Sequence, residues 1–108
     1  MRRGEIWTAA GGVYANKPRP VLIIQDDHFA ATDSVTVIPM TTTAVDAPLL
    51  RIPIEPTPAN GLEQPSQLMI DKVTTTRRSS VQKCLGSLAA ADLVRVERSL
   101  LVFLGMGA

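Results

Sequence analysis

One arginine stands between two prolines, directly before an apolar run, in the segment ANKPRPVLIIQDD (residues 15–27). Pro20 disfavours the α region for the residue before it, so Arg19 is predicted to be extended at the start of a strand. Pro18 restricts the chain on the other side. A guanidinium with so little backbone freedom suits bidentate binding of a phosphate or carboxylate. Taken alone, such an arginine is more often an ordinary surface residue.

Three consecutive threonines end a second apolar segment, IPMTTTA (residues 38–44). Because β-branched residues precede them, the threonines are predicted to lie where a strand passes into a loop. Threonine hydroxyls and free backbone N–H groups both bind phosphate oxygens in nucleic-acid-binding proteins. Ordinary surface threonines at a strand end are an equally simple interpretation of this run by itself.

Basic residues gather in one part of the chain, although the formal net charge is only +1. The segment 72–83 contains no acidic residue, and Lys17 flanks Arg19. The basic residues of the segment 72–83 are Lys72, Arg77, Arg78 and Lys83. They indicate a groove for a few phosphates, whereas a solvated charged loop explains them equally well. The net charge is too small for electrostatic steering by the whole protein.

Short strands must position these residues, and one helix follows them. Six segments have the composition of strands: residues 4–9, 20–25, 34–40, 49–55, 66–75 and 81–87. The run 20–25 is apolar enough to be buried on both faces. After Ala89 the apolar residues recur at helical spacing, with Ser87 near the expected N-cap and Gly105 as the stop. They are Leu93, Val96, Leu100, Phe103 and Leu104. This order predicts a mainly β fold with helices (α+β), in which a C-terminal amphipathic helix packs on a small sheet or partly open barrel.

Length and composition favour one folded domain over residues 1–108. We expect neither a signal peptide nor a membrane span, because no long uncharged apolar stretch is present, and we therefore expect a cytoplasmic protein. A single cysteine, Cys84, is interpreted as a small core residue. With a single histidine, His28, the sequence contains no cluster with zinc-ligand spacing.

The order of these landmarks resembles the MazF/PemK (Kid) family of toxin endoribonucleases from type II toxin–antitoxin systems. The segments RRGEIW, RPVLIIQDD and VIPMTTT, a later strand ending in Asp, and a helix after LGSL carry the resemblance over nearly the whole chain. It implies an SH3-like barrel and a homodimer that cuts single-stranded RNA at short sequences, without a metal or cofactor, and so inhibits translation and growth. It also implies a cognate antitoxin whose C-terminal segment covers the RNA groove.

The resemblance assigns roles to two residues. The family's arginine in its R-P step falls on Arg19, and its threonine falls on Thr41. In such enzymes the ribose 2′-OH attacks phosphorus and leaves a 2′,3′-cyclic phosphate and a 5′-OH. Arg19 would stabilise the charge on the phosphoryl oxygens, and Thr41 would orient the phosphate through its hydroxyl.

Further RNA contacts are expected from residues near Arg19 and Thr41 and from the loop NGLEQPSQ. Tyr14 is the aromatic residue best placed to stack on a base, and Gln64, Ser66 and Gln67 would read sequence. The other expected RNA-binding residues are Lys17, Thr42, Asp71, Lys72 and Arg77.

Departures from the family pattern concern the general base. Many relatives carry a Glu before the R-P step, and Tyr14 stands near that position here. Some relatives have an Arg two residues before the later Asp, where this chain has Met69. Asp26, Asp27 and Asp71 are each open as base or structural residue, and the structural role is preferred for the first two. His28 is interpreted as a turn residue.

Two other functions remain open from the sequence. A gyrase poison resembling the CcdB family would share the fold, but that family relies on a Trp close to its C-terminus and VFLGMGA has none. An SH3-like adaptor for proline-rich peptides would need an aromatic-lined groove. The chain contains only one Trp, one Tyr and two Phe.

Overall fold

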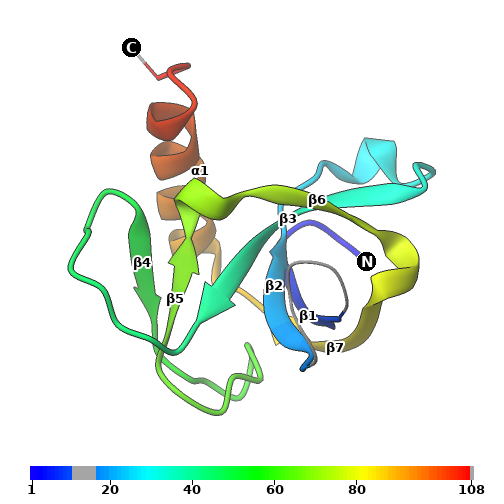
Figure 1. Ribbon diagram of the computed structural model, residues 1–108, viewed down its shortest axis with the longest axis horizontal. Coiled ribbons are helices and arrows are strands. Elements are labelled where there is room, and N and C mark those ends of the chain that lie inside the picture. Colours follow the sequence, from blue (N-terminus) through cyan, green and yellow to red (C-terminus); the bar gives the residue numbers. More distant parts are fainter. Residues whose placement is uncertain (11–16, 108) are drawn as a thin grey trace.

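The computed structural model describes residues 1–10 and 17–107, so the expected contact of Tyr14 lies outside the described residues. The described chain forms a seven-stranded sheet with antiparallel pairs and one α-helix (Figure 1). Its strands are β1 (Glu5–Ala9), β2 (Arg19–Ile23), β3 (Ser34–Thr41), β4 (Arg51–Ile54), β5 (Ser66–Met69), β6 (Thr74–Arg77) and β7 (Val81–Ser87), followed by α1 (Ala90–Phe103). The strand order is β4-β5-β3-β2-β1-β7, with β6 also paired to β3. The predicted mainly β fold that is not closed, with a C-terminal helix, is confirmed.

The central strand β2 is buried on both faces, as its continuous apolar run predicts. Val21, Leu22 and Ile23 are at most 2% exposed. Because side chains alternate across a strand, they enter two separate hydrophobic clusters. Leu22 joins the cluster that includes Val96 of α1, whereas Val21 and Ile23 join a cluster within the curled part of the sheet (Figure 1).

The segment 66–75, predicted as one strand, is two strands separated by a turn. The prediction of an unbroken strand is wrong because β3 is long and pairs with a different strand at each end: Met40 and Thr41 with β5, and residues 34–37 with β6. The chain passes from one to the other through the 3₁₀ turn η3 (Ile70–Lys72). This turn brings Lys72 to the end of β3 that carries the threonines.

The C-terminal helix follows its predicted pattern in its first three turns. Leu93, Val96 and Leu100 pack on the core, and the helix stops before Gly105, which has a φ of +73°. Ser87 does not cap it, because the N-cap is Ala89, which has no side-chain hydrogen-bonding group. Phe103 and Leu104 are 42% and 52% exposed instead of buried, because the end of α1 extends beyond β4 and β5 (Figure 1). In the described chain, no helix has the length and apolar character to cross a membrane.

Candidate functional site

Arg19 and Thr41 meet at one end of the hairpin formed by β2 and β3. The register pairs Val21 with Pro39, and continuing it by two residues places Arg19 opposite Thr41. Arg19 is exposed, and Thr41 is half-buried at the last position of β3. The two residues that the sequence singles out therefore come from adjacent strand ends and project from the same face.

Both residues line a hollow of about 620 Å³, here called the first hollow. Lys72 of η3 also lines it, so two cations face the same space. The other lining residues are Pro39, Met40, Thr43, Met69, Val73 and Thr74. Because the described lining contains two positive charges and no carboxylate, the first hollow suits an anion.

The hydroxyl oxygen of Thr41 is held by the backbone of the loop that follows β3. Thr41 Oγ1 accepts a hydrogen bond from the backbone N–H of Thr43 at 3.1 Å. An oxygen that accepts this bond still has its own proton to donate. Thr41 can therefore donate to a phosphate oxygen in the first hollow, from an orientation that is set before substrate binds.

A second hollow, of about 290 Å³, lies on the other side of the same two strand ends. Residues next to Arg19 and Thr41 line it, since Pro18, Pro20 and Thr42 point away from the first hollow. The remaining lining residues are Thr8, Gly61, Leu62, Glu63, Gln64, Ser66 and Leu85. The structure thus brings together Arg19, Thr41 and Lys72 in one hollow, and Thr42, Gln64 and Ser66 in another.

Four other residues expected to bind RNA lie elsewhere. Gln67 holds the loop after β3, because its amide accepts from Val45 N at 3.1 Å and donates to Val45 O at 3.2 Å. Asp71 is paired with the guanidinium of Arg51 on β4. Lys17 and Arg77 are exposed and line neither hollow.

A family model described as "PemK-like, MazF-like toxin of type II toxin-antitoxin system" matches residues 2–104. The chain belongs to this family. A curated relative, the probable endoribonuclease MazF of Mycolicibacterium smegmatis, is 66% identical over 107 residues, which cover 98% of each chain. The family predicted from the sequence landmarks is confirmed.

Solved structures of MazF toxins share the fold. The toxin MazF-mt6 of Mycobacterium tuberculosis has a TM-score of 0.80 over 94% of this chain and 97% of its own, at 26% identity. A mycobacterial endoribonuclease in complex with its cognate antitoxin also has a TM-score of 0.80, over 98% and 96% of the two chains. At 20% identity, this second likeness shows the fold alone.

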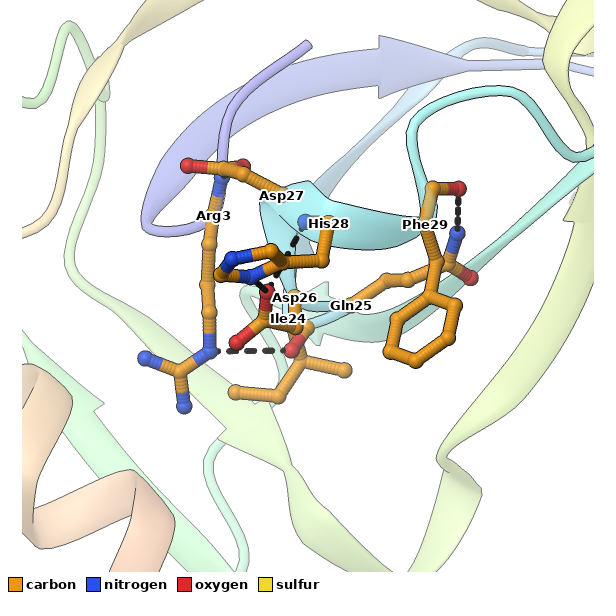
Figure 2. A network of polar contacts seen from close by, with 7 residues as sticks. All are labelled: Arg3, Ile24, Gln25, Asp26, Asp27, His28 and Phe29. Atoms are coloured by element: carbon orange, nitrogen blue, oxygen red, sulfur yellow. Dashed lines mark hydrogen bonds and ion pairs between the residues drawn. The ribbon is translucent and has the colours of Figure 1, made fainter.

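The acidic residues after β2 of this MazF-like toxin have local structural partners. Asp26 caps the 3₁₀ turn η2 (Asp27–Phe29) by accepting from His28 N, and Asp27 accepts from Arg3 N at 2.8 Å. His28 Nδ1 lies 2.6 Å from Asp26 Oδ1 (Figure 2). His28 lies in the predicted turn, and both aspartates make the local contacts expected of structural residues. Because η2 follows the end of β2 opposite Arg19, the group is remote from both hollows along the hairpin.

Several lining residues of the MazF-like toxin were not predicted from its sequence. Met69, noted as a departure from some relatives, lies in the first hollow, and Glu63 lies in the second. Glu63 is exposed and belongs to the loop NGLEQPSQ, which was expected to contact the RNA bases. Its place in that loop is the sequence feature that could have identified it. Within residues 1–10 and 17–107, no three His, Cys, Asp or Glu side chains are grouped to hold a metal ion.

Proposed function

We propose that this MazF-like toxin is an endoribonuclease that cuts single-stranded RNA at a short sequence without a metal ion and so inhibits translation and growth. The observation that carries the proposal is the convergence of Arg19, Thr41 and Lys72 on the first hollow. These residues offer a guanidinium at a strand end, a hydroxyl donor and an ammonium to one phosphate segment. The name of the 66% identical relative, a probable endoribonuclease, supports the reaction class.

The proposed reaction is an internal transesterification. The ribose 2′-oxygen attacks the adjacent phosphorus and loses its proton to a base. The P–O5′ bond breaks, the 5′-oxygen takes up a proton, and a 2′,3′-cyclic phosphate remains. Negative charge increases on the non-bridging oxygens as the fifth P–O bond forms. The guanidinium of Arg19 stabilises this charge and the hydroxyl of Thr41 orients the phosphate, while Lys72 binds the same or a neighbouring phosphate.

Charge stabilisation, and not proton abstraction, is the role that the first hollow supports. Its described lining has no carboxylate or imidazole. Asp71, the acid next to Lys72, is already paired with Arg51. Arginine loses its proton too reluctantly to be a general base at neutral pH. We therefore assign no base among the described residues.

The proposal includes a homodimer and an antitoxin. Large apolar residues remain exposed at the end of α1, which gives an association surface that the fold itself does not cover. They are Leu101, Val102, Phe103, Leu104 and Met106, each at least 42% exposed. An antitoxin segment with acidic side chains would occupy the first hollow in place of RNA. One of the structurally similar endoribonucleases is in complex with its cognate antitoxin.

The deciding experiment uses purified toxin, a long and weakly structured RNA, and EDTA. Cut sites and end groups are mapped for wild type, Arg19→Ala and the control Arg98→Ala. Arg98 is an exposed helical residue that lines neither hollow, so the control removes the same charge elsewhere. Wild type and the control should cut at one short word and leave 5′-OH ends. Arg19→Ala should lose cleavage while its circular dichroism spectrum is unchanged.

Two results would refute parts of the proposal separately. If wild type cuts only after Mg²⁺ is restored, metal independence is wrong. If Arg19→Ala cuts as fast as wild type, the first hollow is not the reaction site.

A further inference from the structure

We propose that the second hollow binds one base of the RNA, splayed out of the strand, and that Glu63 selects bases with an exocyclic amino group over uracil. Adenine, cytosine and guanine carry such a group. The inference rests on the proposed function and extends it, because it names the part of the protein that chooses the RNA word.

The two hollows adjoin along residues 18–20 and 41–43, here called the ridge. Arg19 lines the first hollow and its neighbours Pro18 and Pro20 line the second. In the same way, Thr41 lines the first and Thr42 the second. When an RNA chain places a phosphate against Arg19 in the first hollow, the second hollow, on the other side of the same β-strand ends, is therefore available for a base.

The second hollow has the size and lining of a base site. Its volume of about 290 Å³ is near the lower limit of ~300 Å³ for ligand pockets, which suits one ring system. Pro18, Pro20, Leu62 and Leu85 give apolar surfaces for the faces of a ring. Enzymes that take a base out of its stack hold it between such side chains and read its edge by hydrogen bonds.

Glu63 gives the hollow a preference. Its carboxylate is exposed and makes no ion pair with a side chain in residues 1–10 and 17–107. An ionised carboxylate only accepts hydrogen bonds, so it favours amino N–H groups. Uracil offers one N–H on its edge, at N3, and the carbonyl oxygens on both sides of it repel a carboxylate. The amide of Gln64 and the hydroxyl of Thr42 can bond to the rest of the base edge.

One wall of the second hollow is fixed in advance by the loop between β4 and β5. Asn60 is 4% exposed, and its Oδ1 accepts from the backbone N–H groups of Thr57 and Leu62, each at 3.0 Å. Its Nδ2 donates to Glu55 O at 2.8 Å. A loop ordered by its own buried side chain loses little entropy when a ligand binds.

Two glycines dock this loop on β7. A Cβ on Gly61 would lie 2.0 Å from Leu85 O, and a Cβ on Gly86 would lie 2.1 Å from Ala59 O. No side chain fits at either position, so the backbones touch directly. Ser87 N also donates to Ala59 O at 2.9 Å. These contacts hold Leu62 and Glu63 next to Leu85, where they line the second hollow.

The test compares Glu63→Gln with the control Glu55→Gln. Both variants remove one negative charge from the same loop, but Glu55 is exposed and lines neither hollow. Each toxin digests a random RNA library in EDTA, and sequencing gives the base frequencies around the cut. A second library of 2′-O-methyl oligomers, which cannot be cleaved by 2′-OH attack, is sequenced after retention on immobilised toxin.

At one position of the word, wild type and Glu55→Gln should disfavour uracil by about tenfold or more. Glu63→Gln should lose this discrimination at that position and keep the rest of the word. If Glu63→Gln cuts at the same word as wild type, or cuts all words more slowly by the same factor, the inference is overturned and the proposed function is left intact. If wild type retains oligomers with amino-bearing bases, Glu63→Gln does not, and neither toxin cleaves RNA, the base site is supported and the proposed ribonuclease activity is refuted. A wild type that neither cuts nor retains any oligomer would overturn both.

Discussion

The two hollows differ in charge and in how their walls are held, although the same two strand ends build both. The first presents Arg19 and Lys72 and has no carboxylate in its described lining. The second has apolar lining residues, a carboxylate at Glu63 and a wall formed by a loop that Asn60 holds in place. Alternation along residues 18–20 and 41–43 assigns successive side chains to opposite sides. One strand pair can therefore carry reaction chemistry on one face and sequence choice on the other, and substitutions should separate the two.

The largest effect should come from Arg19→Ala. One preorganised donor to a developing oxyanion contributes about 3 to 4 kcal/mol to catalysis, so cleavage should fall by about 10² to 10³. All words should lose rate by the same factor, because the phosphate is common to them. Single-turnover rates on two or more words measure this.

Arg19→Lys separates charge from geometry at the same site. It keeps the positive charge but loses the planar fork of donors, so a partial recovery relative to Arg19→Ala is expected. A loss restricted to one RNA word would contradict the division between the two hollows.

The next largest effect should be on stability, from Asn60→Ala. Three hydrogen bonds of the Asn60 side chain disappear, and at about 0.5 to 1.5 kcal/mol each the unfolding free energy should fall by about 1.5 to 4.5 kcal/mol. The second hollow should also lose its fixed wall, which relaxes the RNA word. Urea denaturation and cut-site mapping measure the two consequences.

Asn60→Asp is the matched control. It retains an oxygen that accepts from Thr57 N and Leu62 N, and its charge strengthens these two bonds. It loses the donor to Glu55 O and places a carboxylate oxygen against that carbonyl, which is unfavourable. Its stability should therefore lie between those of wild type and Asn60→Ala. A relaxed word in Asn60→Ala with an unchanged denaturation midpoint would contradict the structural role of the loop.

The first hollow was largely predictable from the sequence, because its main residues act locally. Pro20 alone restricts Arg19 to an extended conformation at the start of a strand. The end of the β-branched run places Thr41 at the end of another strand. That both strand ends meet follows from a simple antiparallel hairpin. Which residues form the second hollow was not predictable, because its wall depends on the contact between Gly61 and Leu85, far apart in the chain.

The partners of polar side chains were the least predictable feature. Asp71 and Gln67 have the side-chain types of RNA contacts, but the fold gives the first to Arg51 and the second to the backbone of Val45. Both pairings join segments about twenty residues apart. They depend on the break after β5, which a continuous pattern of strand-forming residues conceals.

Intermediate effects should come from the neighbouring pair Thr41→Val and Thr42→Val. Valine preserves the shape of threonine and removes the hydroxyl. Losing one hydrogen bond to a charged phosphate oxygen, about 1.5 to 3 kcal/mol, should slow cleavage of every word by about 10- to 150-fold in Thr41→Val. Thr42→Val should change the ratio of rates between words instead. Competition assays with two labelled RNAs measure that ratio, and the same response from both variants would mean that the ridge does not separate the hollows.

The smallest effect should come from His28→Gln. The ring of His28 contacts Asp26 (Figure 2) at the end of the hairpin remote from both hollows. The hydrogen bond to the carboxylate of Asp26 raises the pKa of His28 above its ordinary 6.5, and Asp27 adds to the rise. The backbone N–H and ring of His28 lower the pKa of Asp26 below its ordinary 3.8, with a small contribution from Arg3. Stability from the histidine is thus complete below pH 6.5 and is lost as the pH rises through its raised pKa. Stability from the aspartate is present above pH 3.8 and is lost as the pH falls through its lowered pKa.

The pair therefore stabilises the toxin most between pH 3.8 and pH 6.5. Both side chains are exposed and screened by solvent, so the contribution is small. His28→Gln should flatten the dependence of Tm on pH between about pH 6 and pH 8, the range in which histidine changes charge. RNA cleavage by His28→Gln should keep the wild-type rate and word. A cleavage rate that falls in this variant would instead make His28 a participant in the reaction, and the chemistry would then extend beyond the first hollow.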